Sequence, residues 1–255
     1  MLSDRAFLRY QRQIALPEIG EIGQSKLKRS SVLIIGCGGL GSAAGMYLAA
    51  AGIGQLVISD DDVVETSNLQ RQVIYRASDI NTAKVDAMAS QMQSINDELK
   101  VRKLNKRLTQ DQLYLEVMMA DVVLDCSDNL STRHMVNRVC QSQAKPLISG
   151  SAIGWQGQFA VFDFVESQIG CYQCLVPEEA VNRPNKCSES GILGPVVGTI
   201  GNYQALAALQ VIALDKVGFK PRELHLFDGM SLKWQTLTIR PDSECRVCGQ
   251  YQKAS

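Results

Sequence analysis

The sequence predicts an α/β fold with a doubly wound, Rossmann-like and mostly parallel sheet that is extended by antiparallel strands. Three observations support this prediction. Short apolar runs alternate with helical patterns in the first half of the chain, as in βαβ units. A glycine-rich turn follows the first apolar run. Two C-x-x-C pairs lie in the second half and have the spacing of a four-cysteine zinc site.

The first strand leads into a turn that is typical of nucleotide-binding proteins. The preceding segment, Asp4 to Leu27, mixes arginines with apolar residues, so we expect helices that lie across the domain. Val32 to Ile35 is the apolar strand, and Gly36-Cys37-Gly38-Gly39-Leu40-Gly41 connects it to a helix that starts near Ser42. Glycines there let backbone N–H groups and the positive helix end approach a phosphate. The turn predicts a nucleotide site, and packing alone is the alternative.

The second strand supplies a candidate ribose ligand. It runs from Leu56 to Ser59 and ends at Asp60, about 20 residues after the glycines, where a ribose hydroxyl needs an acceptor. The same reasoning predicts the rest of the parallel half: a helix from Thr82 to about Ile95, a strand at Lys100–Leu104, a helix at Gln110–Met119, and strands at Asp121–Cys126 and Pro146–Gly150. Ligands of such sheets bind at the carboxyl ends of the strands.

The pattern changes near Gly154. Alternating residues predict antiparallel strands at Trp155–Phe162, Glu223–Asp228 and Trp234–Ile239. Between them, the apolar run from Val196 to Leu214 predicts a long helix that is too interrupted by glycine and amide residues to span a membrane. We expect the polar residues 177–190 to form a mobile loop that carries Cys187.

Charge and composition exclude several classes of protein. The 255 residues include 26 basic and 26 acidic side chains, so net charge favours neither nucleic acid nor a membrane surface as a partner. No apolar run reaches the roughly 18 residues of a spanning helix, and the first residues do not resemble a signal peptide. We therefore expect a cytoplasmic protein.

Four of the eight cysteines form the two C-x-x-C pairs, Cys171 with Cys174 and Cys245 with Cys248. In a reducing compartment this spacing indicates metal or redox chemistry rather than disulfides. Two such pairs complete a closed tetrahedron around Zn²⁺, which is the pattern of a structural site. A redox pair or unrelated surface thiols are the alternatives.

A polar segment from Glu65 to Gln72 follows the ribose acid. It is either a capped, solvent-exposed turn or part of the nucleotide site. In the second case, Arg71 would bind phosphate oxygens bidentately, and Lys84 at the next helix start would add a point charge. Two extra cations suit a triphosphate, so the segment favours an ATP-cleaving enzyme over a dehydrogenase.

Two more candidates follow the fourth strand and the polar loop. Asp128 would hold Mg²⁺ against the nucleotide, and a hydrogen-bonded loop residue is the alternative. Asp125 either caps the next helix or bonds within its loop. Cys187 lies beside Lys186, which would lower the pKa of a reactive thiol, and a bystander thiol is the alternative. The other cysteines, at positions 37, 126 and 140, are expected to be buried apolar residues.

These segments together resemble the ThiF/MoeB/HesA family of carrier-protein adenylyltransferases, bacterial relatives of the ubiquitin-activating enzymes. The likeness covers nearly the whole chain. The matching segments are Arg9–Gln13, Gly36–Gly41, Ser67–Gln72, Asp125–Asn129, Gly194–Gly198 and Cys245–Gly249. Two positions depart from the family pattern: Cys37 replaces a Leu, and Ala83 stands where a Pro is expected before Lys84.

The resemblance implies a single domain of residues 1–255, with a nucleotide-binding half at 1–150 and a carrier-binding, zinc-bearing half at 151–255. It implies a homodimer in which Arg12 enters the neighbouring subunit's site. Catalytic roles are implied for Arg71, Lys84, Asp128 and Cys187. The nucleotide-binding positions implied within each site are Gly39, Asp60, Asn68, Arg71, Gln72, Lys84 and Asp128.

The implied reaction uses ATP and Mg²⁺. The C-terminal carboxylate of a small ubiquitin-like sulfur carrier, which ends in Gly-Gly, attacks the α-phosphate of ATP and gives an acyl-adenylate and pyrophosphate. Such chemistry asks mainly for positioning and charge neutralisation. No rhodanese-like domain follows Cys248, so we expect a separate sulfurtransferase or cysteine desulfurase to supply sulfur.

Within the family, residues 151–158 and 226–234 are similar to the thiamine branch, which acts on the carrier ThiS for thiazole synthesis. The molybdopterin branch is the alternative. The loop cysteine that forms an acyl disulfide in the thiamine branch matches Cys187, but it does not decide between them. Two rivals lie outside the family: an NAD-dependent oxidoreductase, suggested by the glycine turn and Asp60 alone, and a non-enzymatic zinc-bearing interaction module.

Overall fold

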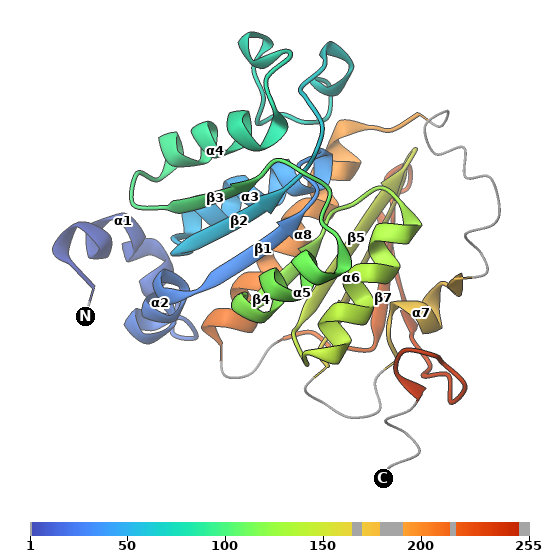
Figure 1. Ribbon diagram of the computed structural model, residues 1–255. Coiled ribbons are helices and arrows are strands. Elements are labelled where there is room, and N and C mark those ends of the chain that lie inside the picture. The colour runs from blue at the N-terminus through green and yellow to red at the C-terminus, as the bar shows by residue number, and fades with distance from the viewer. Residues whose placement is uncertain (1, 165–169, 179–190, 215–217, 250–255) are drawn as a thin grey trace.

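The computed structural model describes residues 2–164, 170–178, 191–214 and 218–249. One eight-stranded sheet, in the order β3-β2-β1-β4-β5-β6-β7-β8, forms its centre (Figure 1). The first five strands are parallel and the last three pair antiparallel. The strands are β1 Ser31–Ile35, β2 Gln55–Ser59, β3 Lys100–Leu104, β4 Val122–Asp125, β5 Leu147–Ile153, β6 Gln156–Phe162, β7 Glu223–Asp228 and β8 Lys233–Thr238.

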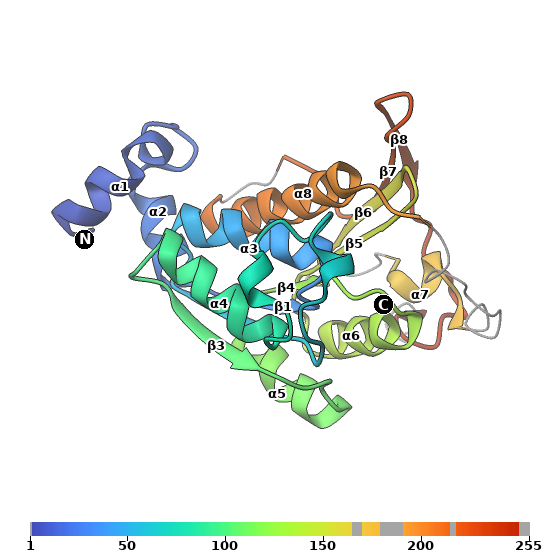
Figure 2. The same ribbon diagram turned by 90° about the horizontal axis from the view of Figure 1, so that it is seen from above.

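Helices cover both faces of the sheet (Figures 1 and 2). One face carries α3, α4 and α8, and the other carries α5 and α6. Two N-terminal helices, α1 and α2, lie beside the amino ends of the strands. The helices are α1 Asp4–Ile14, α2 Gly20–Arg29, α3 Gly39–Ala51, α4 Lys84–Ile95, α5 Gln110–Met119, α6 Leu130–Ser142, α7 Tyr172–Leu175 and α8 Gly194–Ala213, with 3₁₀ turns at Thr66–Asn68 and Ala77–Asp79.

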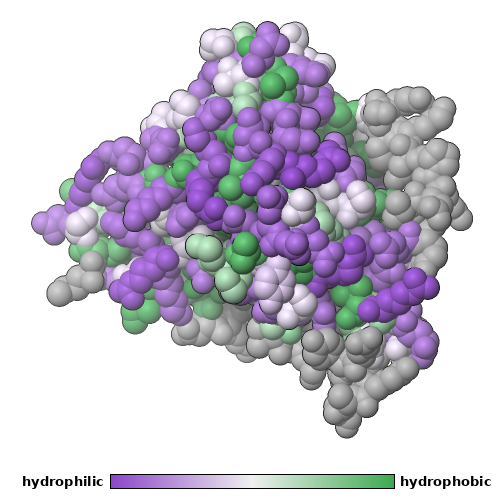
Figure 3. All heavy atoms as spheres, viewed as in Figure 1, coloured by the Kyte–Doolittle hydropathy of each residue, from purple (hydrophilic) through white to green (hydrophobic). Residues whose placement is uncertain are grey.

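The apolar strands form because both of their faces are buried. Val32 and Ile34 pack into the core under α3 and α8, while Leu33 and Ile35 pack into the core under α5 and α6. Successive strand residues point to opposite faces, so a continuous apolar run fills both cores. The outer surface of the α5 and α6 layer is mostly hydrophilic, with scattered apolar residues (Figure 3).

The expected strands and helices are confirmed, including the change from parallel to antiparallel pairing after β5. Sequence reasoning gave no bounds for α6 and missed the short α7. The reason lies in the burial pattern of α6, where polar side chains face inward: Thr132, Arg133, His134 and Asn137 are all buried. Because polar residues share this buried face with Val136, Val139 and Cys140, the helix lacks the regular apolar periodicity that indicates helices in a sequence.

Helix α8 packs against α3 and is bound to the sheet by a polar side chain. Among the described residues it alone is long and apolar enough to cross a membrane, and half of its apolar window is buried. The buried side chain of Gln204 donates to the carbonyl oxygens of Asp125, at 2.9 Å, and Ile148, at 3.1 Å. Helix α8 is therefore bonded directly to the end of β4 and the start of β5.

Replacing Gln204 by Leu is expected to lower the free energy of unfolding by about 2 kcal/mol or more, because two buried carbonyl groups lose their donor. The measurement is urea unfolding, compared with Gln93→Leu, an exposed position on α4. Equal stability of the two variants would contradict this role of Gln204.

Candidate nucleotide and metal sites

The glycine turn between β1 and α3 is too tight for other residues. Gly36 has a φ of 96°, and a Cβ there would lie 2.7 Å from the carbonyl oxygen of Cys126. At Gly41 a Cβ would lie 1.9 Å from the carbonyl oxygen of Gly36. The helix therefore starts directly against the end of the strand, and its first N–H groups face the carboxyl edge of the sheet.

Two side chains hold this turn in place. Asp60 Oδ2 accepts from the N–H of Cys37 at 2.7 Å, and its Oδ1 accepts from the N–H of Asp62 at 2.9 Å. Burial raises the pKa of Asp60, while both backbone bonds oppose that rise. On the other side, the Tyr75 hydroxyl donates to the carbonyl oxygen of Cys37 at 2.8 Å. Burial raises the pKa of Tyr75, which therefore stays a neutral donor.

Sequence reasoning missed Tyr75. It lies just beyond the Glu65 to Gln72 segment, in a stretch without strand or helix periodicity, and no motif marks it. A single buried tyrosine outside a regular element has no signal that distinguishes it from ordinary core packing.

Lys84 lies at the first turn of α4 and is almost fully buried. Its Nζ contacts Asp62 Oδ2 at 2.7 Å, and its backbone N–H donates to the carbonyl oxygen of Asp62 at 2.9 Å. Asp62 itself is exposed. A buried ammonium with one exposed carboxylate partner can exchange that partner for another anion at the same edge of the sheet.

The segment from Glu65 to Gln72 forms a capped turn beside the carboxyl edge of the sheet. Asn68 is buried, and its Oδ1 accepts from the N–H of Glu65 at 3.1 Å, which closes a 3₁₀ turn. Arg71 Nη1 donates to the carbonyl oxygen of Ser67 at 2.9 Å. The capped-turn interpretation is therefore correct for the backbone of this segment.

Gln72 in the same segment has an unused buried acceptor. Its side chain is buried, and its Oε1 has no hydrogen-bond partner within the described part of the chain. Its Nε2 lies 3.9 Å from the position that a Cβ on Gly38 would take. An orphaned polar atom beside the glycine turn fits a site that a polar ligand completes.

The turn after β4 carries the next candidates. Asn129, rather than Asp125, caps α6, because its Oδ1 accepts from the N–H of Thr132 at 2.9 Å. Asp125 is buried and pairs with Arg133, whose Nη1 lies 3.5 Å from Asp125 Oδ2. This leaves Asp128 exposed at the tip of the turn, where a carboxylate is available to a hydrated cation.

The structure places the candidate residues for the reaction with ATP and the carrier in different ways. Those at the carboxyl ends of β1, β2 and β4 share one edge of the sheet: Gly39, Asp60, Asn68, Arg71, Gln72, Lys84 and Asp128. Arg12 does not share it. Its neighbours on α1, Arg9 and Gln13, bond to the carbonyl oxygens of Ile95 and Ala51, at the far ends of α4 and α3. Cys187 lies outside the described residues.

Arg12 is therefore separated from the glycine turn of its own chain by the length of α3. That helix has 13 residues and a length of about 20 Å. Arg12 is exposed on α1, so it is available to another molecule.

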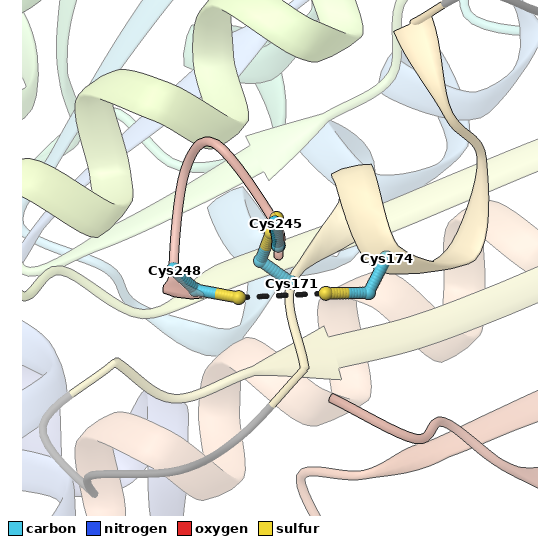
Figure 4. A group of neighbouring side chains, drawn as sticks. All are labelled: Cys171, Cys174, Cys245 and Cys248. Carbon is cyan, nitrogen blue, oxygen red and sulfur yellow. Dashed lines mark hydrogen bonds between the residues drawn. The ribbon is translucent and has the colours of Figure 1, made fainter. Parts of the chain in front are cut away.

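The four C-x-x-C cysteines converge in space (Figure 4). Their sulfur atoms all lie within 4.8 Å of one another, with Cys171 and Cys245 3.8 Å apart and Cys174 and Cys248 3.4 Å apart. Zn–S bonds of about 2.3 Å in a tetrahedral site place sulfur atoms about 3.8 Å apart. The backbone N–H of Asp242 also donates to Cys174 Sγ at 3.4 Å, as around metal-bound thiolates. The cluster fits a closed, structural zinc site.

The remaining described cysteines are buried, at positions 37, 126 and 140. Burial raises the pKa of each of these thiols, so they stay protonated. They match the expectation of small apolar core residues.

Comparison with known proteins gives a consistent result. Residues 10–247 match the ThiF family. The chain is 45% identical over 248 residues to the sulfur carrier protein ThiS adenylyltransferase of Escherichia coli (strain K12), covering 97% of each chain. It is 41% identical to the adenylyltransferase and sulfurtransferase MOCS3 of Dictyostelium discoideum, covering 94% of this chain and 57% of that relative.

Solved structures agree on the fold. The crystal structure of E. coli MccB with succinimide has a TM-score of 0.81 at 23% identity, covering 94% of this chain and 73% of that chain. At this identity the likeness concerns the fold alone.

Cys174→Ser is expected to lower the zinc content below one per chain and to lower Tm, because three thiolates bind the metal less tightly and zinc binding contributes to folding. Zinc is measured by elemental analysis and Tm by calorimetry. Cys140→Ala is the control, since it alters a cysteine that lies away from the cluster. Full zinc occupancy in the serine variant would refute the zinc site.

Proposed function

The chain belongs to the ThiF family, and from that membership we propose that it adenylylates the C-terminal glycine carboxylate of the sulfur carrier ThiS, for the thiazole of thiamine. The products are the carrier acyl-adenylate and pyrophosphate. The coarser activity, adenylyltransferase of a sulfur carrier, follows from the family and from the names of its relatives. An NAD-dependent oxidoreductase does not agree with this membership.

The site chemistry suits this reaction. The nucleophile is already an anion, so no general base is required, and the enzyme has to neutralise charge and align the carboxylate with the α-phosphate. Lys84 is buried at the start of α4 and exchanges its contact with Asp62 for a phosphate oxygen. Arg71 lies on the adjacent turn and adds a second, bidentate cation. Asp60 binds the ribose, beside the glycine turn that it already braces.

Magnesium would be held by Asp128. This carboxylate is exposed on the turn after β4. Arg133 and Asn129 hold that turn in place through hydrogen bonds to its backbone and to the start of α6. Mg²⁺ keeps several waters and usually takes one or two carboxylates plus substrate phosphates, so a single exposed aspartate is sufficient. When bound, the ion would neutralise charge on the phosphates that leave as pyrophosphate.

We further propose a homodimer with two composite sites. Arg12 is too far from the glycine turn of its own chain to act there, and it is exposed on a helix at the opposite end of the domain. A two-fold arrangement brings such a residue into the partner's site in both directions at once. Arg12 would then supply the third cation around the triphosphate.

The thiamine branch is favoured by one observation. The ThiS adenylyltransferase of E. coli matches this chain over 97% of both proteins, whereas MOCS3 of D. discoideum is matched over only 57% of its length. The second candidate is the molybdopterin-type carrier, since identity to MOCS3 is nearly as high, at 41%. In both cases the chemistry at the sheet edge is the same.

Other assignments complete the proposal. The antiparallel half, residues 151–255, would bind the carrier and hold the structural zinc. Cys187 would form the acyl disulfide with the carrier, and a separate sulfurtransferase or cysteine desulfurase would supply sulfur. The protein would act in the cytoplasm as a soluble enzyme, without nucleic acid or membrane partners.

Lys84→Ala and Arg12→Ala are each expected to reduce ATP–pyrophosphate exchange by about 100-fold or more. Mixing the two variants should restore about a quarter of the wild-type rate, because half of the random dimers contain one intact composite site. Subunit exchange is verified by native mass spectrometry. Lys103→Ala, an exposed lysine of β3, is the control.

No recovery in verified mixed dimers would contradict composite sites. Full activity of Lys84→Ala alone would contradict the phosphate role of the lysine. Absence of exchange in the wild type itself would favour the non-enzymatic zinc-bearing module.

The carrier is identified by exchange assays with purified ThiS-type and molybdopterin-type carriers, each ending in Gly-Gly. Exchange should depend on the ThiS-type carrier, with a carrier that lacks its last glycine as the control. Preference for the molybdopterin-type carrier would keep the chemistry and overturn the thiamine assignment, and exchange with neither would overturn both.

A further inference from the structure

A closed ring of hydrogen bonds joins the glycine turn to the start of α4. Asp60 accepts from the N–H of Cys37 at 2.7 Å and from the N–H of Asp62 at 2.9 Å. The carbonyl oxygen of Asp62 in turn accepts from the N–H of Lys84 at 2.9 Å. The Tyr75 hydroxyl closes the ring, because it lies 2.8 Å from the carbonyl oxygen of Cys37 and 3.4 Å from that of Lys84.

The Tyr75 hydroxyl has one proton and faces two carbonyl oxygens. The contact with Cys37 is the short branch of this bond, and the contact with Lys84 is the long, weaker branch. Tyr75, Cys37 and Lys84 are all buried. A buried carbonyl oxygen that loses its donor pays the full cost of its lost hydration, so the backbone around it either moves or stays unsatisfied.

The ring uses only the backbone of Lys84 and leaves its ammonium group for other contacts. That ammonium contacts the carboxylate of Asp62 at 2.7 Å, and this carboxylate is exposed. A phosphate can therefore take the ammonium from Asp62 while every bond of the ring stays in place. The ring sets the point at which the side chain of Lys84 leaves the backbone, relative to the glycine turn.

The segment that carries Arg71 is held in a different way. The N–H of Arg71 donates to the carbonyl oxygen of Asn68 at 3.0 Å, and the N–H of Tyr75 donates to that of Gln72 at 3.1 Å. Both are backbone bonds that need no hydroxyl group. The Tyr75 hydroxyl therefore supports Lys84 and the glycine turn, but not Arg71.

We propose that Tyr75 is a positioning residue whose hydroxyl holds Lys84 and the glycine turn at the spacing at which both contact one triphosphate. This inference rests on the proposed function, because it takes Lys84 as a cation that binds the phosphates of ATP. Tyr75 itself needs no contact with ATP: it acts through the two backbone carbonyl groups that its hydroxyl faces.

The hydroxyl is tested by Tyr75→Phe, which keeps the buried ring and the backbone bond to Gln72 and removes only the donor. Tyr10→Phe is the matched control. Tyr10 is also buried, and its hydroxyl accepts from Asn96 Nδ2 at 3.0 Å, at the far end of α4 from Lys84. Both variants lose a buried hydroxyl, but only one of them loses it beside the glycine turn.

A double-mutant cycle separates positioning of Lys84 from general support of the fold. Tyr75→Phe is combined with Lys84→Ala, which keeps the backbone groups of the ring and removes the ammonium, and separately with Arg71→Ala. The Kd of Mg·ATP is measured by calorimetry for each protein. If Tyr75 acts through Lys84, its hydroxyl has no effect on ATP binding once the ammonium is gone.

Tyr75→Phe should raise the Kd of Mg·ATP by about three- to tenfold, the worth of one buried hydrogen bond. In the Lys84→Ala background the same change should alter Kd by less than about twofold, whereas in the Arg71→Ala background it should keep its full effect. Tyr10→Phe should leave Kd unchanged. An amino group in place of the hydroxyl, as p-aminophenylalanine at position 75, restores a donor and should restore the wild-type Kd.

Three results would overturn the inference and leave the proposed function standing. They are an unchanged Kd in Tyr75→Phe, equal weakening of ATP binding with and without the ammonium of Lys84, and loss of the folded state in Tyr75→Phe, which would make the hydroxyl a requirement of folding. A wild type that does not bind Mg·ATP, or Lys84→Ala that binds it as tightly as the wild type, would instead refute the proposed function, and this inference with it.

Discussion

The carboxyl edge of the parallel sheet is the constraint on which the structure depends. A nucleotide site needs backbone N–H groups there that no side chain covers. Yet each buried carbonyl and N–H group of the strand ends requires a hydrogen-bond partner. Three side chains supply these partners: Arg133 for Ser127 and Gly150, Gln204 for Asp125 and Ile148, and Tyr75 for Cys37. They come from a helix on each face and from the loop before α4, so the edge forms only when both layers are in place.

This edge is rigid for an energetic reason. Breaking a buried ion pair such as Asp125 with Arg133 costs about 3–5 kcal/mol, because the remaining charge is left without a partner. Carboxylate attack on a phosphate is accelerated mainly by charges that are already in position. The same network that satisfies the strand ends would therefore hold the edge in position for the proposed reaction. The cysteine cluster adds to it by joining residues 171–174 and 245–248, which are far apart in the chain.

Much of the fold could be predicted from the sequence because local patterns determine it. Apolar runs such as Val32–Ile35, next to turn residues, are typical of strands buried on two faces, and alternation from Trp155 onward is typical of strands with unlike faces. Helix α6 resisted prediction, since its buried residues include Arg133, His134 and Asn137. These polar side chains are buried because residues of other helices and strands contact them. The sequence of α6 alone does not show which residues these are.

Some features of the candidate site could likewise be predicted from the sequence, and others could not. The sequence by itself determined the glycine turn, the acid at Asp60 and the two cysteine pairs, because their function depends on spacing along the chain. Only the tertiary structure decided that Asn129 and not Asp125 caps α6, that Lys84 is buried against Asp62, and that Tyr75, Arg133 and Gln204 support the site. Those roles arise from contacts between residues distant in sequence, and burial, which gives them their energy, exists only after the chain has folded.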